Sequence, residues 1–273
     1  EDVQDQVELT LMRSGEHIVA RSYVLYREER RQVREKTPEV KVNAGDIRVT
    51  LKDGALQVLD KKRLQTICKE ACQGLVDVDA KAIFTDSARN LFDGVKVDDV
   101  SKALILSART LIEKEPNYSY ATARLLLDSL RAEALGYLGV AESATFEEMK
   151  TLYPKALKAY VEKGIELELL DPKLRQFDLD KLGAAIDNSR DLQFTYLSMQ
   201  TLYDRYFLHH QGTRFELPQI LFMRVAMGLS LEEDKPTERA IEFYNMFSSF
   251  NYMSSTPTLF NAGTLRSQLS SCY

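Results

Sequence analysis

The stretch PQILFMRVAMGL, residues 218–229, has apolar side chains at nearly every position and decides the class of fold. Pro218 suits the first position of an α-helix, where its missing N–H is not needed. A helix that is apolar almost all round is stable only when other parts of the protein cover it. We therefore predict a central helix over residues 218–229, enclosed by further helices.

Helical patterns lie on both sides of this stretch. Upstream, Thr145 precedes Glu148 by three residues, which is the spacing of a capping box. Residues 188–208 predict one long amphipathic helix, and residues 212–217 (GTRFEL) predict a turn or a brief extended segment. Downstream, residues 236–252 predict another helix. Met and aromatic side chains recur here at helical spacing, which indicates core packing. The apolar stripe of residues 188–208 comprises Leu192, Phe194, Tyr196, Leu197 and Leu202.

Small hydroxyl side chains then cluster around a single cysteine, Cys272, in SSTPTLF (residues 254–260) and NAGTLRSQLSSCY (residues 261–273). Ser and Thr commonly cap local turns, and a lone cysteine most often behaves as a small buried hydrophobe. Taken by themselves, these residues favour packing over chemistry.

A different pattern occupies the earlier part of the chain. In residues 47–60, IRVTLKDGALQVLD, apolar and polar residues alternate on both sides of an Asp-Gly pair, the strongest short hairpin signal. Residues 3–15 and 16–36 predict two helices before it, and residues 37–46 read as a linker. Four helical patterns follow the hairpin, over residues 61–75, 79–92, 97–114 and 118–136.

Composition excludes several classes of protein. The 273 residues suffice for about two domains. A net charge of -5 argues against a nucleic-acid partner. No apolar run reaches the roughly 18 residues of a membrane span, and no secretory signal opens the chain. Three cysteines fit a reducing compartment, so we expect a cytoplasmic protein.

Cys68 and Cys72 lie four residues apart on one predicted helix face, where two thiols could contact a metal. No second Cys or His pair stands at ligand spacing, and the three histidines are remote in sequence. We therefore interpret both cysteines as small core residues and predict no metal site.

The order of these segments resembles the large subunit of class I ribonucleotide reductase. PQILFMRVAMGL, SSTPTLFNAGT and QLSSC carry the resemblance, which extends over about residues 145–273. It implies a mainly α fold, the helical N-terminal region of a reductase. The α/β catalytic barrel of the family would begin near the end of this sequence, so the barrel is expected to be mostly missing and the sequence to be an N-terminal fragment.

The upstream residues resemble ATP-cones, small regulatory domains at the front of many such subunits. IRVTLKDGALQVLDKKRL and YSYATARLLLDSLRAEALG resemble one cone, and VELTLMRSGEHIVARSYVLYREER resembles the closing helices of another. A cone is a helical bundle with a small β-hairpin cap. The resemblance implies three parts: the end of a truncated first cone at residues 1–36, a second cone at residues 45–137, and the helical domain at residues 144–273.

The resemblance also implies roles for three residues. In the reductase family a cysteine pair closes to a disulfide as it supplies two electrons to the ribonucleotide. Cys272 matches the first cysteine of that pair, whose partner would lie downstream. Thr256 and Ser271 match substrate-binding hydroxyls, which can hold a ribose hydroxyl or a phosphate oxygen without adding charge.

The second cone departs from its family at positions expected to meet nucleotide phosphates. Leu51 stands where a Lys is usual, and Lys52 faces the opposite side of the strand because side chains alternate. Glu133 stands where basic residues are common, and a carboxylate repels phosphate at short range. Further departures are Val97, Ser101 and Ala132. We predict that residues 45–137 keep the cone fold and bind no nucleotide, and that any ATP or dATP effector site belongs to the first cone.

For the full-length subunit, the resemblance implies radical reduction of ribonucleoside diphosphates for DNA precursor synthesis. It implies a small (beta) subunit whose metal site generates the radical, thioredoxin or glutaredoxin as reductant, and a homo-oligomer of large subunits. No cofactor is expected in this chain, and the chain alone is expected to be inactive. One alternative is an adenosylcobalamin-dependent reductase, which needs no radical subunit. Another is a cone that serves only regulation or subunit contact.

Overall fold

The computed structural model describes residues 2–14, 19–24, 47–51 and 54–271, and it divides into two compact units, Glu1–Asp46 and Ile47–Tyr273. In the first unit, α1 (Asp2–Arg13) confirms the first predicted helix. Residues 19–24 are helical as well. The rest of the second predicted helix and the linker at residues 37–46 lie outside the described residues.

The predicted hairpin is present at the start of the second unit, and a third short strand, which the sequence did not predict, joins it to form a small cap. β1 (Arg48–Thr50) pairs antiparallel with β2 (Leu56–Val58) and parallel with β3 (Val95–Lys96), in the order β2-β1-β3. Gly54 in the connecting turn has a φ of +84°. Glycine reaches this left-handed conformation without a Cβ clash, which explains why Asp-Gly predicted the hairpin.

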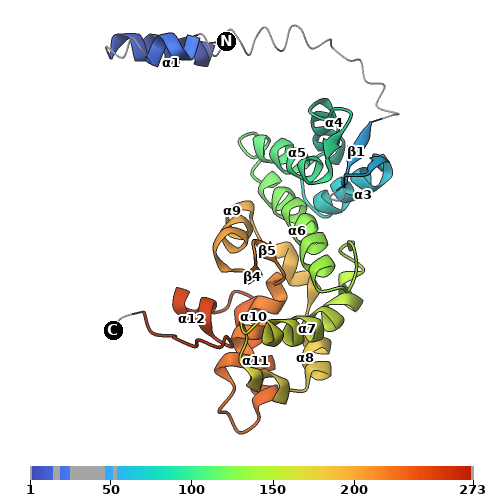
Figure 1. Ribbon diagram of the computed structural model, residues 1–273, viewed down its shortest axis with the longest axis vertical. Coiled ribbons are helices and arrows are strands. Elements are labelled where there is room, and N and C mark those ends of the chain that lie inside the picture. The colour runs from blue at the N-terminus through green and yellow to red at the C-terminus, as the bar shows by residue number, and fades with distance from the viewer. Residues whose placement is uncertain (1, 15–18, 25–46, 52–53, 272–273) are drawn as a thin grey trace. The chain divides into compact units, whose positions relative to one another are not determined.

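Four helices complete the cone region, defined here as residues 47–137, and α5 packs on β3 of the cap (Figure 1). The carboxylates of Asp60 and Asp79 accept the backbone N–H groups of Arg63 and Lys81, so they cap α3 and α4. Each helix packs on the next, and α3 also packs on α6. All four confirm predicted helices: α3 (Lys61–Cys72), α4 (Ala80–Arg89), α5 (Val97–Thr110) and α6 (Tyr118–Tyr137).

Residues 138–271, called the helical region here, surround the predicted central helix, α10 (Pro218–Leu229). Every α10 residue from Pro218 to Met227 is buried, which confirms the prediction. α11 (Pro236–Ser248) and α12 (Thr256–Asn261) both contact α10. The remaining elements are α7 (Met149–Glu166), η1 (Pro172–Gln176), α8 (Leu179–Ala185), η2 (Asn188–Gln193), α9 (Tyr196–Thr201), η3 (Leu202–Tyr206), β4 (His209–His210) and β5 (Thr213–Arg214).

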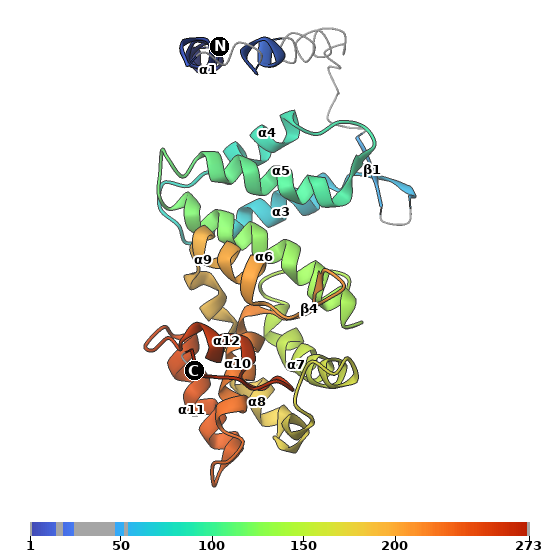
Figure 2. The same ribbon diagram turned by 60° about the vertical axis from the view of Figure 1, so that its left-hand side comes forward.

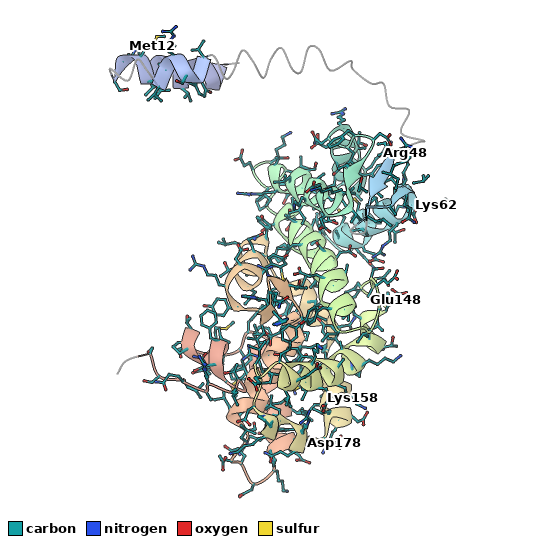
Figure 3. The ribbon with its side chains drawn as sticks, in the orientation of Figure 1. Met12, Arg48, Lys62, Glu148, Lys158 and Asp178 are labelled. Carbon is teal, nitrogen blue, oxygen red and sulfur yellow. The ribbon has the colours of Figure 1, made fainter. Side chains whose placement is uncertain are left out.

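The capping box predicted before α7 is present. The N–H of Thr145 donates to Glu148 Oε2 at 2.8 Å, and the N–H of Glu148 donates to Thr145 Oγ1 at 3.3 Å. Glu148 is labelled in Figure 3. The β5 strand likewise confirms the brief extended segment predicted within residues 212–217.

The prediction of one long helix over residues 188–208 is wrong. The 3-10 turn η2 ends before Phe194, whose backbone is extended at φ -72° and ψ 133°. The Phe194 ring is buried against the rings of Phe222 and Phe250. The extended residues Phe194 and Thr195 therefore separate η2 from α9, and the Phe194 ring packs at this break. Leu197, counted in that stripe, is 75% exposed.

The helix α6 is shared between the cone region and the helical region, as Figures 1 and 2 show. It packs on α3 and α5 in the cone region and on α9, η2 and β5 in the helical region. Leu127, Leu130, Ala134 and Leu135 are therefore at most 1% exposed. The two regions therefore share the buried residues of α6.

The fold is mainly α with a small β cap, as predicted. Across the described part of the chain, no helix combines the length and apolar character that crossing a membrane requires.

Candidate functional site

Thr256, a predicted substrate-binding hydroxyl, is the first residue of α12 and is exposed. Its Oγ1 lies 3.1 Å from the hydroxyl of Tyr206, the last residue of η3. The Tyr206 ring stacks on Phe260, with centroids 4.5 Å apart and planes 3° from parallel. One polar and one aromatic contact therefore join η3 to the helix that presents Thr256.

Arg224 of the apolar helix α10 holds the other end of α12. Its buried guanidinium donates to the carbonyl oxygens of Ala262 at 2.7 Å, Leu259 at 3.0 Å and Phe260 at 3.3 Å. The last carbonyls of a helix lack partners within the helix, and a cation there also complements the helix dipole. Arg224 therefore fixes the short helix whose first residue is Thr256.

Glu216 balances the charge of Arg224 in the same buried network. Arg224 Nε donates to Glu216 Oε1 at 2.7 Å, and the Tyr160 hydroxyl donates to the same oxygen at 2.5 Å. Burial lowers the pKa of Arg224, but Glu216 and Tyr160 outweigh it and the net shift is upward. Burial, reinforced by Glu216, raises the pKa of Tyr160 well above its ordinary value. Arg224 therefore stays a cation at neutral pH, and Tyr160 stays a neutral donor.

Two glycines bring the backbone of α10 against the segment after α12. A Cβ at Gly228 would lie 2.1 Å from the backbone N of Gly263, closer than real Cβ contacts. Gly263 has a φ of +75°, and its carbonyl accepts the N–H of Asp171 at 3.1 Å. Leu170 and Thr264 form a β-bridge beside it. The NAGT sequence is thus held between α10 and the segment at residues 170–171.

Of the other predicted site residues, Ser271 is exposed, and Cys272 lies outside the described residues. The chain leading to Ser271 is tied to α12, because the Asn261 side chain donates to the carbonyl of Gln268 at 2.7 Å. The roles predicted for Thr256, Ser271 and Cys272 remain predictions at this point.

In the cone region, the Glu133 carboxylate contacts the helical region. Oε2 accepts the Tyr203 hydroxyl at 2.9 Å, and Oε1 accepts the N–H of Arg214 at 2.7 Å. The carboxylate placed where basic residues are common in the cone family is thus bonded to the helical region, and the predicted repulsion of phosphate remains a prediction. Lys52 lies outside the described residues. The other altered positions are partly buried: Leu51, Val97, Ser101 and Ala132.

A second buried network joins α6 to the helical region. Arg131 Nη2 lies 3.6 Å from Asp191 Oδ2, and both side chains are buried. The Tyr153 hydroxyl donates to Asp191 Oδ2 at 2.7 Å, and the Gln219 amide donates to Oδ1 at 2.8 Å. Burial raises the pKa of Asp191, and the opposing charge of Arg131 offsets part of that rise.

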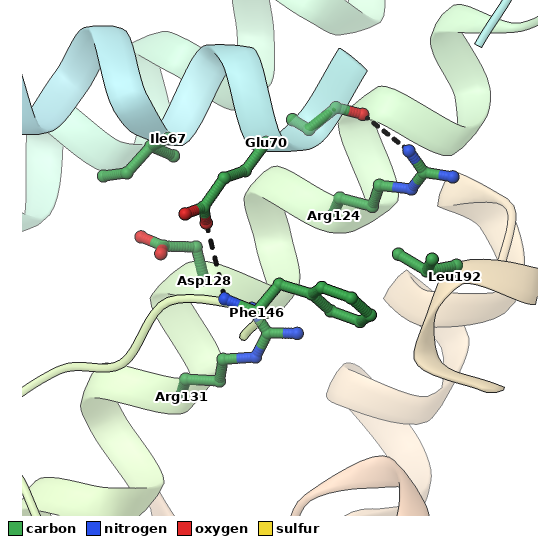
Figure 4. A pocket seen from close by; sticks show the side chains of 8 residues that line it. Ile67, Glu70, Arg124, Asp128, Arg131, Phe146 and Leu192 are labelled. Atoms are coloured by element: carbon green, nitrogen blue, oxygen red, sulfur yellow. Dashed lines mark hydrogen bonds between the residues drawn. The ribbon is translucent and has the colours of Figure 1, made fainter. Parts of the chain in front are cut away.

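A pocket of about 20 Å³ lies beside this network, where the cone region meets the helical region (Figure 4). In it Glu70 accepts the N–H of Phe146 at 3.4 Å, and Arg124 donates to the carbonyl of Ala71 at 3.0 Å. Such a volume admits about one water, so no nucleotide fits. The pocket is lined by Ile67, Glu70, Ala71, Arg124, Asp128, Arg131, Phe146 and Leu192.

Cys68 is buried in the cone region, as predicted, and Cys72 is partly buried. Burial raises the pKa of Cys68 to about 12 and that of Cys72 to about 11. Thiols with such pKa values form little thiolate, the species that binds metals and attacks electrophiles. Within the described residues, no three His, Cys, Asp or Glu side chains are grouped to hold a metal ion.

Comparison with known proteins extends these observations. Residues 47–133 match the ATP cone domain, and residues 192–267 match the family described as ribonucleotide reductase, all-alpha domain. Over its full length, the chain is 43% identical to the ribonucleoside-diphosphate reductase subunit alpha of Chlamydia trachomatis, covering 26% of that protein.

The chain belongs to the ribonucleotide reductase large-subunit family.

Two more distant members of the family show the same relation. The subunit alpha of Helicobacter pylori is 34% identical over 83% of this chain and 27% of its own length. Ribonucleoside-diphosphate reductase 1 subunit alpha of Escherichia coli is 28% identical over 82% of this chain and 29% of its own length. The chain thus spans about a quarter of the length of the reductase subunits it matches.

The reductase match includes α10 and α12, but sequence reasoning missed the residues that connect them. Arg224 carried a signal, because it is the one charged residue in PQILFMRVAMGL. A charge inside an otherwise apolar helix must find partners when buried. Tyr206 and Glu133 carried no comparable signal for these contacts, since Thr256 and Tyr203 lie 50 and 70 residues away from them.

Proposed function

We propose that this chain is part of a catalytic subunit that reduces ribonucleoside diphosphates to deoxyribonucleoside diphosphates by radical chemistry. The observation that carries the proposal is the 43% identity to a ribonucleoside-diphosphate reductase subunit along the whole chain. The anchored α12 supports it, because a site that binds substrate needs exposed polar groups on a fixed scaffold.

Thr256 and Ser271 are the proposed substrate-binding hydroxyls, and Cys272 is the proposed first cysteine of the redox pair. Oxidation of two thiols to a disulfide releases two electrons and two protons. These balance the replacement of the ribose 2′-hydroxyl by hydrogen with loss of one water. An external dithiol of the thioredoxin or glutaredoxin type then reduces the disulfide by exchange.

The two cones are proposed to differ in nucleotide binding. Residues 1–36 are the end of a first cone, residues 45–137 are a second cone without nucleotide, and residues 144–273 begin the catalytic part. ATP and dATP would act on the full-length subunit elsewhere than in residues 45–137. Photolabelling of that subunit with azido-ATP, followed by peptide mapping, should yield no labelled peptide from residues 45–137. A labelled peptide there, displaced by ATP, would contradict the proposal.

The proposed activity is tested with the full-length subunit, a small radical-generating subunit and a thioredoxin system. We expect deoxyribonucleotide formation only when the small subunit is present. Cys272→Ser should abolish multiple turnover, whereas the matched control Cys72→Ala, which changes a cone cysteine, should retain it. Turnover with adenosylcobalamin and no small subunit would instead identify the alternative type of reductase.

A further inference from the structure

We propose that Tyr206 is a positioning residue for Thr256, and that Glu133 of the cone helix α6 supports it by holding the turn from which Tyr206 projects. The inference rests on the proposed substrate contact of Thr256. It assigns the cone region a role at the site that does not depend on nucleotide binding.

The first step is the contact between the two hydroxyls, 3.1 Å apart. Each hydroxyl has one hydrogen to donate and can accept as well. When Tyr206 donates to Thr256, the hydrogen of Thr256 remains available for a substrate oxygen. The neighbouring hydroxyls of Ser255 and Thr258 pair with each other at 3.2 Å. Tyr206 therefore sets the direction in which Thr256 can donate.

The second step is the turn that carries Tyr206. η3 is a π-helical turn, closed by the bond from the N–H of Phe207 to the carbonyl of Leu202 at 3.0 Å. π-helical turns are rare and are frequently found at functional sites. Here the turn places Tyr206 against both Thr256 and Phe260.

The third step is the support of this turn by α6. The Glu133 carboxylate accepts the Tyr203 hydroxyl within η3 and the N–H of Arg214 in β5. The Arg214 guanidinium donates to the Tyr203 carbonyl at 2.5 Å and lies 3.7 Å from the centroid of its ring. Burial, together with Glu133, raises the pKa of Tyr203 to about 12, so its hydroxyl remains a donor. The turn is thus held from the cone region on one side and from β5 on the other.

The test uses the full-length subunit with its small subunit and measures KM and kcat for a ribonucleoside diphosphate. Tyr206→Phe removes only the hydroxyl and keeps the stack on Phe260. We expect KM to rise about three- to tenfold with little change in kcat, which is the effect of one lost hydrogen bond in substrate binding. The unfolding midpoint should stay at the wild-type value. Tyr203→Phe, which removes the bond to Glu133, should raise KM by about twofold.

Thr256→Ala supplies the control that separates positioning from direct binding. It should raise KM by itself, and adding Tyr206→Phe to it should cause no further rise, because coupled residues are non-additive. If Tyr206→Phe raises KM by the same factor in the wild type and in Thr256→Ala, the inference is overturned. It is also overturned if Thr256→Ala raises KM while Tyr206→Phe leaves KM unchanged. A wild-type subunit without reductase activity would contradict the proposed function itself.

Discussion

The cone region and the helical region each contain an ion pair between an arginine and a carboxylate, but one pair is exposed to solvent and the other is buried. Arg48 and Asp93 join β1 to the turn before β3, and their side chains are 54% and 45% exposed. Arg224 and Glu216 are 0% exposed, and together they bind α7, α10 and the end of α12. Solvent screens the first pair, whereas removing one member of the second leaves a buried charge without a partner. The fold therefore depends far more on the buried pair.

Arg224→Met tests this comparison with the largest expected effect. The substitution leaves Glu216 buried without its cation and removes the donors to three α12 carbonyls. We expect the free energy of unfolding to fall by about 3–5 kcal/mol, measured by urea denaturation. The matched control is Arg239→Met on α11, whose exposed pairs should leave the midpoint unchanged within error. Equal destabilisation by both variants would contradict the comparison.

Gly228→Ala is expected to have the second-largest effect on stability. It tests the backbone contact beside the buried ion pair. The atoms nearest to an added Cβ are backbone atoms of residues 262 and 263, which cannot move aside like a flexible side chain. Overpacking of this kind is expected to lower the free energy of unfolding by about 2 kcal/mol. Gly136→Ala in α6 meets no atom within 4 Å and should stabilise by about 0.5–1 kcal/mol. A neutral Gly228→Ala would show that the two segments can separate.

The two cysteines of the cone region allow their burial to be tested through the pH dependence of thiol reactivity. Their folded pKa values, about 12 for Cys68 and about 11 for Cys72, lie above those of exposed thiols. Neutral thiols therefore contribute stability below the ordinary thiol pKa, and this contribution is lost as pH rises towards 11–12. Alkylation by iodoacetamide should be slow at pH 7 and accelerate about tenfold per pH unit up to pH 10. Urea-unfolded protein is the control, and equally fast reaction of the folded protein would refute the burial.

Asp93→Asn should show the smallest effect and completes the comparison. The Arg48 side chain and N–H donate to Asp93, which lowers the pKa of that carboxyl to about 2. The stability from this pair is present above the unfolded pKa of about 4 and is lost as pH falls through about 2. The small difference in unfolding midpoint between wild type and Asp93→Asn should therefore shrink from pH 5 to pH 2. If the difference in unfolding midpoint between the two proteins grows as the pH falls, the pH dependence assigned to this ion pair is wrong.

Local signals predicted much of the fold. Asp60, Asp79 and Thr145 cap helices through neighbours two or three residues away, and the turn at Gly54 needs only its own backbone conformation. The break at Phe194 was missed because it depends on Phe222 and Phe250, which lie 28 and more residues further along the chain. Apolar periodicity cannot distinguish a helical stripe from a ring that packs at a break.

The candidate site was predictable only in part, for the same reason. Resemblance indicated Thr256, which the structure shows exposed at the start of α12, and its binding role remains a prediction. Nothing local connects Arg224 to carbonyls 35–38 residues away, or Glu133 to Tyr203, 70 residues away. These contacts arise only when the fold brings distant segments together, so the structure was needed to find them.

The most direct test of the proposed function measures product without any external reductant. The full-length subunit is reduced beforehand, freed of reductant and mixed with the small subunit and a ribonucleoside diphosphate. If Cys272 belongs to the redox pair, the wild type should form deoxyribonucleotide in an amount comparable to the subunit present and then stop. Cys272→Ser, with substrate binding intact, should form far less. An equal amount of product from both proteins would contradict the role of Cys272.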